Sequence, residues 1–235
     1  MSLENQQVLY FKFFLASSSI SAASADKMMI KARGGKVWHK KAKQAGEVPK
    51  GLTGLDKEAT WSYSKTDGWI YGHGSFSLTS HTKTVVGLFI WMPNSASEAK
   101  RLGEEAPKFT DLLKTVCMDS KADDETLYSD LLTECGIKLL TVPRAGMDKT
   151  ERRQLMIAEQ LKAENRKIYR NRAITVEPMQ AVIKEIFGLE ECWMRGNRSN
   201  RWILAAMGIA VQMAQHQADQ ENQSTWKIKE AVCGL

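Results

Sequence analysis

The chain of 235 residues is 43% hydrophobic and 26% charged, and its net charge is +6 at pH 7. This composition is ordinary for a soluble globular protein and excludes wholesale disorder, while the length suffices for one large domain or two small ones. The four cysteines form no Cys-x-x-Cys pair and the four histidines lack metal-ligand spacing, which argues against a zinc site and indicates a reducing compartment. The positive charge suits a polyanionic partner.

The N-terminal residues admit two interpretations. Val8–Phe14 is apolar and residues 23–25 read Ala-Ser-Ala, which imitates a secretory signal. Glu4 replaces the basic region of such a signal, however, and Lys12 interrupts the apolar run. We therefore favour a first β-strand for this segment. The other apolar stretch, residues 202–214, is too short to span a bilayer and predicts a buried helix, so a soluble cytoplasmic protein is expected.

The first half of the chain carries strand signals. Residues 20–26 are small and form a weak strand signal that ends at Asp26. Residues 31–60 are basic and rich in turn formers, as in an extended connector. Residues 68–80 and 84–91 are aromatic and β-branched runs separated by a short polar stretch, which predicts an antiparallel hairpin.

Two helices are expected before the next strand. Asn94 or Ser95 is suited to cap a helix that runs to Leu102. A second helix is expected over Phe109–Lys114, and it leads into a short strand over Thr115–Met118.

A strand–helix–strand unit follows. The strand at 115–118 precedes a helix over Glu125–Glu134, for which Asp123 is the expected N-cap and Gly136 the C-terminal glycine. Ile137–Val142 is then a buried strand, and this succession predicts a right-handed parallel crossover.

Helices close the chain. Residues 149–167 are highly charged and look helical, and Pro178 opens a helix that ends near Gly188. Ser199 or Asn200 begins the last apolar helix, which becomes polar from residue 216. The complete order predicts an α/β fold in which a mixed sheet is flanked by helices.

Three acidic residues stand where such a fold places ligands. Asp119 follows the strand at 115–118, and sheets of this class bind ligands at the carboxyl ends of their strands. Asp26 ends the first strand. Glu177 precedes Pro178, which places it at the mouth of a helix. If these carboxylates converge, a pair of divalent cations would balance their charge, and oxygen ligands favour Mg²⁺ or Mn²⁺. The alternative is that each acid is an ordinary cap or turn residue.

A sequence motif around Glu177 favours the first of these two interpretations, in which the carboxylates converge. Tyr169-x-x-Arg172 followed by Glu177 and Lys184 is similar to the Tyr–Arg–Glu–Lys signature of DDE transposases of bacterial insertion sequences, which the chain resembles over roughly residues 20–215. One departure is that four residues separate Arg172 from Glu177, where the commonest form has three. The resemblance implies an RNase H-like fold and metal-dependent strand cleavage and strand transfer at insertion-sequence ends. It further implies that Asp26 and Asp119 are the principal metal ligands and that Glu177 completes the site.

The resemblance also implies contacts with double-stranded DNA. Arg172 and Lys184 suit phosphate contacts, and Tyr169 suits a phosphate or a base. The run 27–50 contains eight Lys or Arg residues against one acid, and it would follow the DNA backbone. Its expected DNA contacts are Lys31, Arg33, Lys36, Lys40 and Lys41. A homodimer on DNA and a nucleoid-associated location are expected from the family.

The aromatic and methionine side chains suggest packing. We interpret Trp61, Trp69 and Trp91 as sheet packing, not base stacking, and place Met207 and Met213 on a buried helix face.

Two questions stay open at the level of sequence. Asp56 rivals Asp26 as the first acid, since Asp26 is followed by Lys27-Met28 where the family has small residues and Thr or Ser. Asp26 is preferred because it leaves the block at 61–71 downstream, as in the family. The other question is activity, because residues 1–19 could be the remnant of a DNA-binding region, with 20–215 catalytic and 216–235 a polar tail. The alternatives are a truncated, inactive DNA-binding protein and an RNase H-like nuclease without strand transfer.

Overall fold

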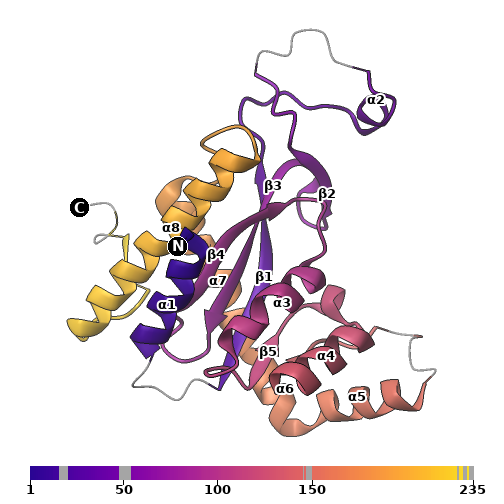
Figure 1. The fold of residues 1–235 in the computed structure, drawn as a ribbon, viewed down its shortest axis with the longest axis vertical. Helices are drawn as coiled ribbons and strands as arrows, with labels where there is room; N and C mark the ends of the chain where they lie inside the picture. Colours follow the sequence, from indigo (N-terminus) through magenta and orange to yellow (C-terminus); the bar gives the residue numbers. More distant parts are fainter. Residues whose placement is uncertain are drawn as a thin grey trace.

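A computed structural model describes residues 1–15, 21–47, 54–144, 146, 150–226, 228, 229 and 232. Over these residues a curled, mixed β-sheet is flanked by helices, which confirms the predicted α/β class and is compatible with an RNase H-like fold (Figure 1). No helix in the described part of the chain is long and apolar enough to cross a membrane.

The sheet is built around the pair formed by β1 and β3. Its order is β2-β3-β1-β5-β6, and β4 also pairs with β3. β1 runs antiparallel to β3, whereas β5 and β6 run parallel to β1. The strands are β1 (Ala22–Lys31), β2 (Thr60–Ser64), β3 (Gly68–Ser80), β4 (Val86–Pro93), β5 (Thr115–Cys117) and β6 (Lys138–Leu140).

Helices cover both faces of the sheet, and each face has its own apolar core. One core joins α1, α3 and α4 to the sheet, and the other joins α7 and α8 to its opposite face. The α-helices are α1 (Leu3–Leu15), α2 (Lys40–Gln44), α3 (Glu98–Glu105), α4 (Glu125–Cys135), α5 (Glu151–Leu161), α6 (Ala163–Arg170), α7 (Val176–Phe187) and α8 (Asn197–Gln220). The short 3₁₀ helices are η1 (Ala106–Phe109), η2 (Ser120–Ala122) and η3 (Asn171–Ile174).

Several predicted elements are confirmed. β3 and β4 form the expected antiparallel pair, and β5, α4 and β6 form the expected parallel unit. Gly136 ends α4 and Gly188 ends α7, both in the left-handed conformation that glycine adopts without steric cost.

The strand prediction for Val8–Phe14 is wrong, because this segment lies in α1. Its buried side chains, Val8, Phe11 and Phe14, recur at three-residue steps and so line one face of a helix. Leu9 and Phe13 on the outer face are apolar but exposed. With both faces apolar, the segment lacks the polar stripe that normally reveals a helix in sequence.

Two helix caps differ from the prediction by one to three residues. Ser97 caps α3 by accepting a hydrogen bond from the Lys100 amide, while Asn94 is buried and donates to backbone carbonyls. Asp124, not Asp123, caps α4. Asp123 is instead buried against Arg153 of α5, a contact that no local sequence pattern predicts.

Other boundaries also shift. Residues 106–109 form the 3₁₀ helix η1, where a helix over 109–114 was predicted. The last helix begins at Asn197, ahead of Ser199 and Asn200. The first strand continues to Lys31, so Asp26 lies in its middle and does not end it.

Glutamine side chains form hydrogen bonds with backbone groups along the open edge of β4, where α1 and α8 lie side by side (Figure 1). Gln7 of α1 accepts from the Phe89 amide at 2.7 Å and donates to the Phe89 carbonyl at 3.2 Å. Gln212 and Gln215 of α8 bond the β4 backbone near Val86 in the same way. Amide side chains thus replace a neighbouring strand and protect the edge from pairing with another chain.

We expect Gln7→Leu to lower the free energy of unfolding by about 1–3 kcal/mol, because it leaves buried donors and acceptors of Phe89 unpaired. Urea unfolding followed by circular dichroism measures the change. The control is Gln6→Leu, one position away on the less buried side of α1, which should change stability by less than about 0.5 kcal/mol. Equal effects of the two substitutions would contradict this role of Gln7.

Candidate active site

Asp26 lies on the face of β1 that packs against α7. Side chains alternate along a strand, so Asp26 shares its face with Met28 and Ile30, which pack in the core formed with α7 and α8. β5 pairs with β1 only over Ala22–Ser24, so in the described part of the chain no strand pairs with this edge of β1 at Asp26. Asp26 is therefore half-buried at an opening in the sheet.

Asp119 lies two residues after the end of β5, at that opening. Ser24 of β1 forms the last pair with Cys117 of β5, and Asp26 and Asp119 each lie two residues beyond that pair. The charge of Asp119 contributes to the raised pKa of Asp26. The Asp119 side chain accepts a hydrogen bond from the Lys121 amide at 2.9 Å and so caps η2. This is the carboxyl end of a parallel strand, where the sequence placed it.

Glu177 projects from the first turn of α7, and a buried contact fixes that turn to the sheet. Gln180, one turn further along the helix, donates to Ser77 Oγ at 2.6 Å, and Ser77 Oγ donates to the Asp26 carbonyl at 3.3 Å. Because residues three apart share a face of a helix, this contact turns Glu177 toward β1.

Arg172 of η3 lies among these acids. Its Nη1 is 2.6 Å from Glu177 Oε1, and its Nη2 is 3.4 Å from Asp26 Oδ2. Burial alone would lower the pKa of Arg172, but the negative charges of Asp26 and Glu177, with smaller contributions from Tyr169 and Asp119, raise it above its ordinary value. Arg172 is therefore a permanent counter-charge to the cluster.

One arginine does not balance the cluster. Burial raises the pKa of Asp26 to about 6; Arg172 opposes this rise, and the charges of Glu98 and Asp119 add to it. The raised pKa means that burial and the neighbouring acids disfavour the ionised form of Asp26 by more than Arg172 favours it.

Glu98 is an acid near this site that the sequence did not single out. It lies in the first turn of α3, is 4% exposed, and pairs with Lys27 at 3.5 Å and Lys121 at 3.3 Å. Its Oε2 atom has no hydrogen-bond partner among the described residues. Only the packing of α3 on the sheet buries Glu98, so no local pattern could have identified it.

The other signature residues are placed differently. Tyr169 on α6 is half-buried, and its interactions with Arg172, Asp119 and Glu177 place it beside the acids. Lys184 lies two turns along α7 from Glu177 and pairs with Glu190 at 2.9 Å. Lys184 therefore does not join the contacts around Arg172.

The predicted basic DNA contacts lie away from the acids. Lys31 is five residues beyond Asp26, about 16 Å along the strand. Lys31, Arg33, Lys36, Lys40 and Lys41 are exposed on the end of β1, the following loop and α2. Lys50, the last residue of the basic run, lies outside the described residues.

Asp56 is held in a separate hydrogen-bond network. Its carboxylate accepts from His73 Nε2 at 2.9 Å and from the Gly196 amide at 2.9 Å. Trp91 Nε1 donates to His73 Nδ1 at 3.1 Å, so the two ring nitrogens of His73 join Trp91 to Asp56. The structure thus brings Asp26, and not Asp56, to Arg172 and Glu177.

One packing prediction was wrong. Trp91 is buried in the core, and Trp69, although 61% exposed, packs against Tyr63 of the neighbouring strand β2, as sheet packing predicts. Met207 is buried, whereas Met213 is 55% exposed on the outer side of α8.

The oxygen atoms of these carboxylates are suitable ligands for a hard divalent cation. In the arrangement described here, however, the carboxylates do not form a metal site. Among the described residues, no three histidine, cysteine or acidic side chains are arranged to hold a metal ion. The Arg172 guanidinium occupies the space between Asp26 and Glu177. The available ligands are all oxygen atoms, which Mg²⁺ and Mn²⁺ prefer. A cation there would also offset the burial that disfavours the ionised form of Asp26.

The chain is similar to a known protein family over part of its length. Residues 138–215 match the model of a family described as a transposase DDE domain. The matched segment contains Glu177 and the whole of the Tyr–Arg–Glu–Lys motif, and it ends within α8. This match covers about a third of the chain and supports the resemblance to DDE-type transposases that was predicted from sequence. Among curated proteins and among solved structures, no match was found.

Proposed function

We propose that this protein is a DNA transposase that cleaves and transfers strands at insertion-sequence ends through Asp26, Asp119 and Glu177. The main support is that acids from β1, β5 and α7 surround one arginine, Arg172. Residues 138–215, which include Glu177, match the transposase family, and such enzymes act on DNA with divalent metals.

Asp26 and Asp119 would be the principal ligands of Mg²⁺ or Mn²⁺, and Glu177 would complete the site. Bound ions supply activation of water or a 3′-hydroxyl for in-line attack on phosphorus and neutralise charge on the phosphate. The protein contributes the positions of these acids, which β1, β5 and the contact between Gln180 and Ser77 fix.

Arg172 would pair first with the acids Asp26 and Glu177 and then with a phosphate of the DNA. Without DNA it neutralises Asp26 and Glu177, which otherwise repel each other. With cations bound at the acids, its planar guanidinium would be free to bind a phosphate with two hydrogen bonds. Tyr169 and Lys184 would contact the same DNA, and the basic residues from Lys31 to Lys41 would follow its backbone. Two copies on DNA would hold the paired ends.

The decisive experiment uses a DNA fragment that contains the chain's own coding sequence with its natural flanks. Purified protein with Mg²⁺ should cut at both flanks and join the released ends to a target plasmid, and EDTA should stop both steps. Cutting that ignores the flanks and never joins strands would identify an RNase H-like nuclease. Binding of the fragment without any cutting would identify an inactive DNA-binding protein.

A further inference from the structure

Glu98 is a buried acid that the proposed chemistry does not use. Its Oε1 atom is shared by two lysines, at 3.5 Å from Lys27 Nζ and 3.3 Å from Lys121 Nζ. Its Oε2 atom is buried and has no hydrogen-bond partner in the described part of the chain. Burial of a carboxylate is costly unless cations offset it. The two lysines are therefore what stabilises Glu98 in its buried position.

The two lysines have different surroundings. The Lys27 side chain is 5% exposed and donates to the Asn94 carbonyl at 3.1 Å, so it is enclosed by protein. The Lys121 side chain is 56% exposed. Together with Glu98 the lysines carry one net positive charge, since two ammonium groups face one carboxylate. Because Lys27 is enclosed, Lys121 presents this charge to the solvent.

The backbone of Lys121 is fixed beside Asp119. The Lys121 amide donates to Asp119 Oδ1 at 2.9 Å, and Arg144 Nη2 donates to the Lys121 carbonyl at 2.6 Å. These bonds fix the point from which the Lys121 side chain starts, and the contact with Glu98 fixes its end. A lysine that is held at both ends loses less conformational entropy on binding a ligand than an unrestrained one.

Lys121 also interacts with the acids of the candidate active site. Burial opposes its charged form, but Glu98 and, more weakly, Asp119 and Asp26 raise the pKa of Lys121 above its ordinary value. Charges act on one another in this way only when they are near. Lys121 therefore adds positive charge next to Asp119, whereas Arg172 contacts Asp26 at 3.4 Å.

We propose that the Lys121 ammonium group binds a phosphate of the DNA beside Asp119, and that Glu98 is the residue that positions it. An ammonium group has three donors, and the bond to Glu98 uses one of them. A phosphate that approaches carboxylates needs such a counter-charge, and here one positive charge exceeds what Glu98 requires. The inference rests on the proposed function, which brings DNA to these acids.

DNA binding in EDTA tests this contact without the metal-dependent chemistry. A fluorescently labelled duplex from the flank of the coding sequence is titrated over a range of salt concentrations. Each phosphate contact adds about 0.9 to the slope of log K against log salt. Lys121→Gln should therefore lower the slope by about 0.9 and weaken binding about threefold or more, while Lys121→Arg should keep the slope of the parent. Because the Lys121 side chain is mostly exposed, the circular dichroism spectrum should not change.

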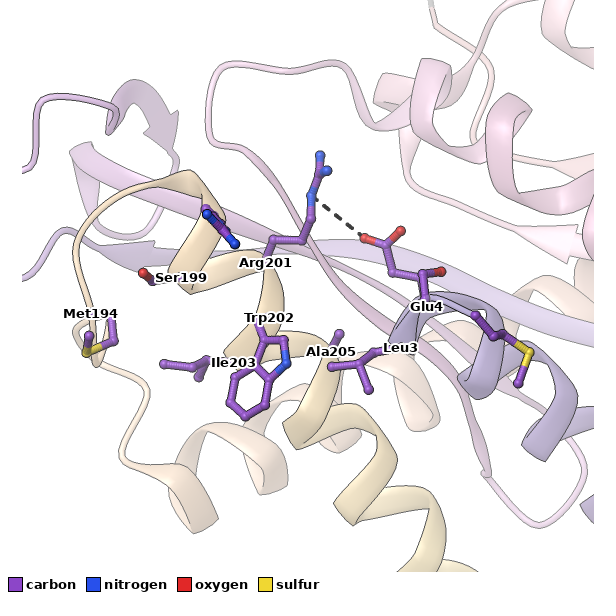
Figure 2. A pocket seen from close by; sticks show the side chains of 11 residues that line it. Leu3, Glu4, Met194, Ser199, Arg201, Trp202, Ile203 and Ala205 are labelled. Atoms are coloured by element: carbon purple, nitrogen blue, oxygen red, sulfur yellow. Dashed lines mark ion pairs between the residues drawn. The ribbon is translucent and has the colours of Figure 1, made fainter.

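The matched control is an ion pair between α1 and α8. Arg201 Nε is 3.9 Å from Glu4 Oε1 beside a hollow of about 910 Å³, as Figure 2 shows. The Arg201 side chain is 60% exposed, and it also lies over the Trp91 ring. Arg201→Gln removes the same charge as Lys121→Gln and should leave the slope unchanged. An equal fall in both variants would show that net charge, and not Lys121, sets the slope.

Glu98→Gln separates positioning from net charge. This substitution makes the protein more positive by one charge, so it should tighten DNA binding if net charge alone matters. If Glu98 positions Lys121, the variant should bind DNA about threefold more weakly, because a neutral amide holds an ammonium group less strongly than a carboxylate does. Glu98→Gln also leaves Lys27 buried without its counter-charge, so its fold is checked by circular dichroism. If that variant does not fold, the Lys121 variants decide.

Three results overturn the inference: a parent chain that does not bind the duplex, an unchanged slope in Lys121→Gln, and a slope in Lys121→Arg as low as in Lys121→Gln. Binding by folded Glu98→Gln that is as tight as that of the parent, or tighter, overturns the positioning role. Cleavage with Mg²⁺ is measured separately. A chain that does not cut, but whose slope falls in Lys121→Gln, has the phosphate contact and lacks the proposed function. A chain that cuts, but whose slope does not fall, has the function and lacks this contact.

Discussion

Replacing Glu177 with glutamine is expected to reduce Mg²⁺-dependent strand cleavage by about 10²-fold or more while leaving the fold and DNA binding intact. Glutamine has nearly the size of glutamate, and its carbonyl oxygen can still accept the hydrogen bond from Arg172 Nη1. What it loses is the negative charge that a divalent cation requires. The measurement is the rate of cleavage of DNA that carries both flanks of the coding sequence.

The matched control is Glu185→Gln on the same helix. Glu185 is exposed, pairs with Lys229 at 3.0 Å and lies two turns from Glu177. Its substitution removes the same charge from α7, so unchanged cleavage would show that position, not net charge, matters. Full activity of the Glu177→Gln protein, or full activity in EDTA, would rule out the proposed role of Glu177.

The site could be predicted from sequence where its signals are local. Asp119 follows a compact β-branched strand, and Glu177 precedes a proline within a recognisable motif, so their positions required no knowledge of distant residues. Asp26 was assigned to the end of a strand because Lys27 and Lys31 look like the start of a basic run. In the fold, β3 pairs with β1 all the way to Lys31, and this pairing places Asp26 in mid-strand.

Long-range contacts account for the rest. Glu98 and Asp123 are buried only because α3 and α5 pack where they do, and nothing adjacent in sequence marks either residue. The residues around Asp56 are typical of a turn. Its hydrogen-bond partners His73 and Gly196, however, come from two distant segments of the chain. α1 was misassigned because Leu9 and Phe13 make its outer face apolar as well as its inner face.

The ion pair between Asp123 and Arg153 predicts a second large effect, on stability. Arg153 is 3% exposed and contacts the Asp123 carboxylate directly. That carboxylate also accepts from the Arg144 amide at 2.6 Å and from Thr141 Oγ1 at 3.3 Å. The pair therefore ties α5 to the loop that joins β5 to α4.

Asp123→Ala should lower the free energy of unfolding by about 3–5 kcal/mol, because it leaves a buried guanidinium without its counter-charge. The double variant Asp123→Ala, Arg153→Met should recover a large part of that loss, since it buries no unpaired charge. Urea unfolding of both variants, with Arg153→Met alone, completes a double-mutant cycle. A double variant that is less stable than Asp123→Ala would contradict this account.

The adjacent residue supplies the control. Asp124 is exposed and caps α4 by accepting from the Leu127 amide at 2.9 Å, so Asp124→Ala should cost only about 1 kcal/mol. The sequence predicted Asp123 as the cap. If that prediction were right, Asp124→Ala would lower the free energy of unfolding more than Asp123→Ala. The ratio of the two decreases in the free energy of unfolding therefore distinguishes a buried ion pair from a surface cap at neighbouring positions. It also tests whether this ion pair holds α5 against the strand unit that ends at Asp119.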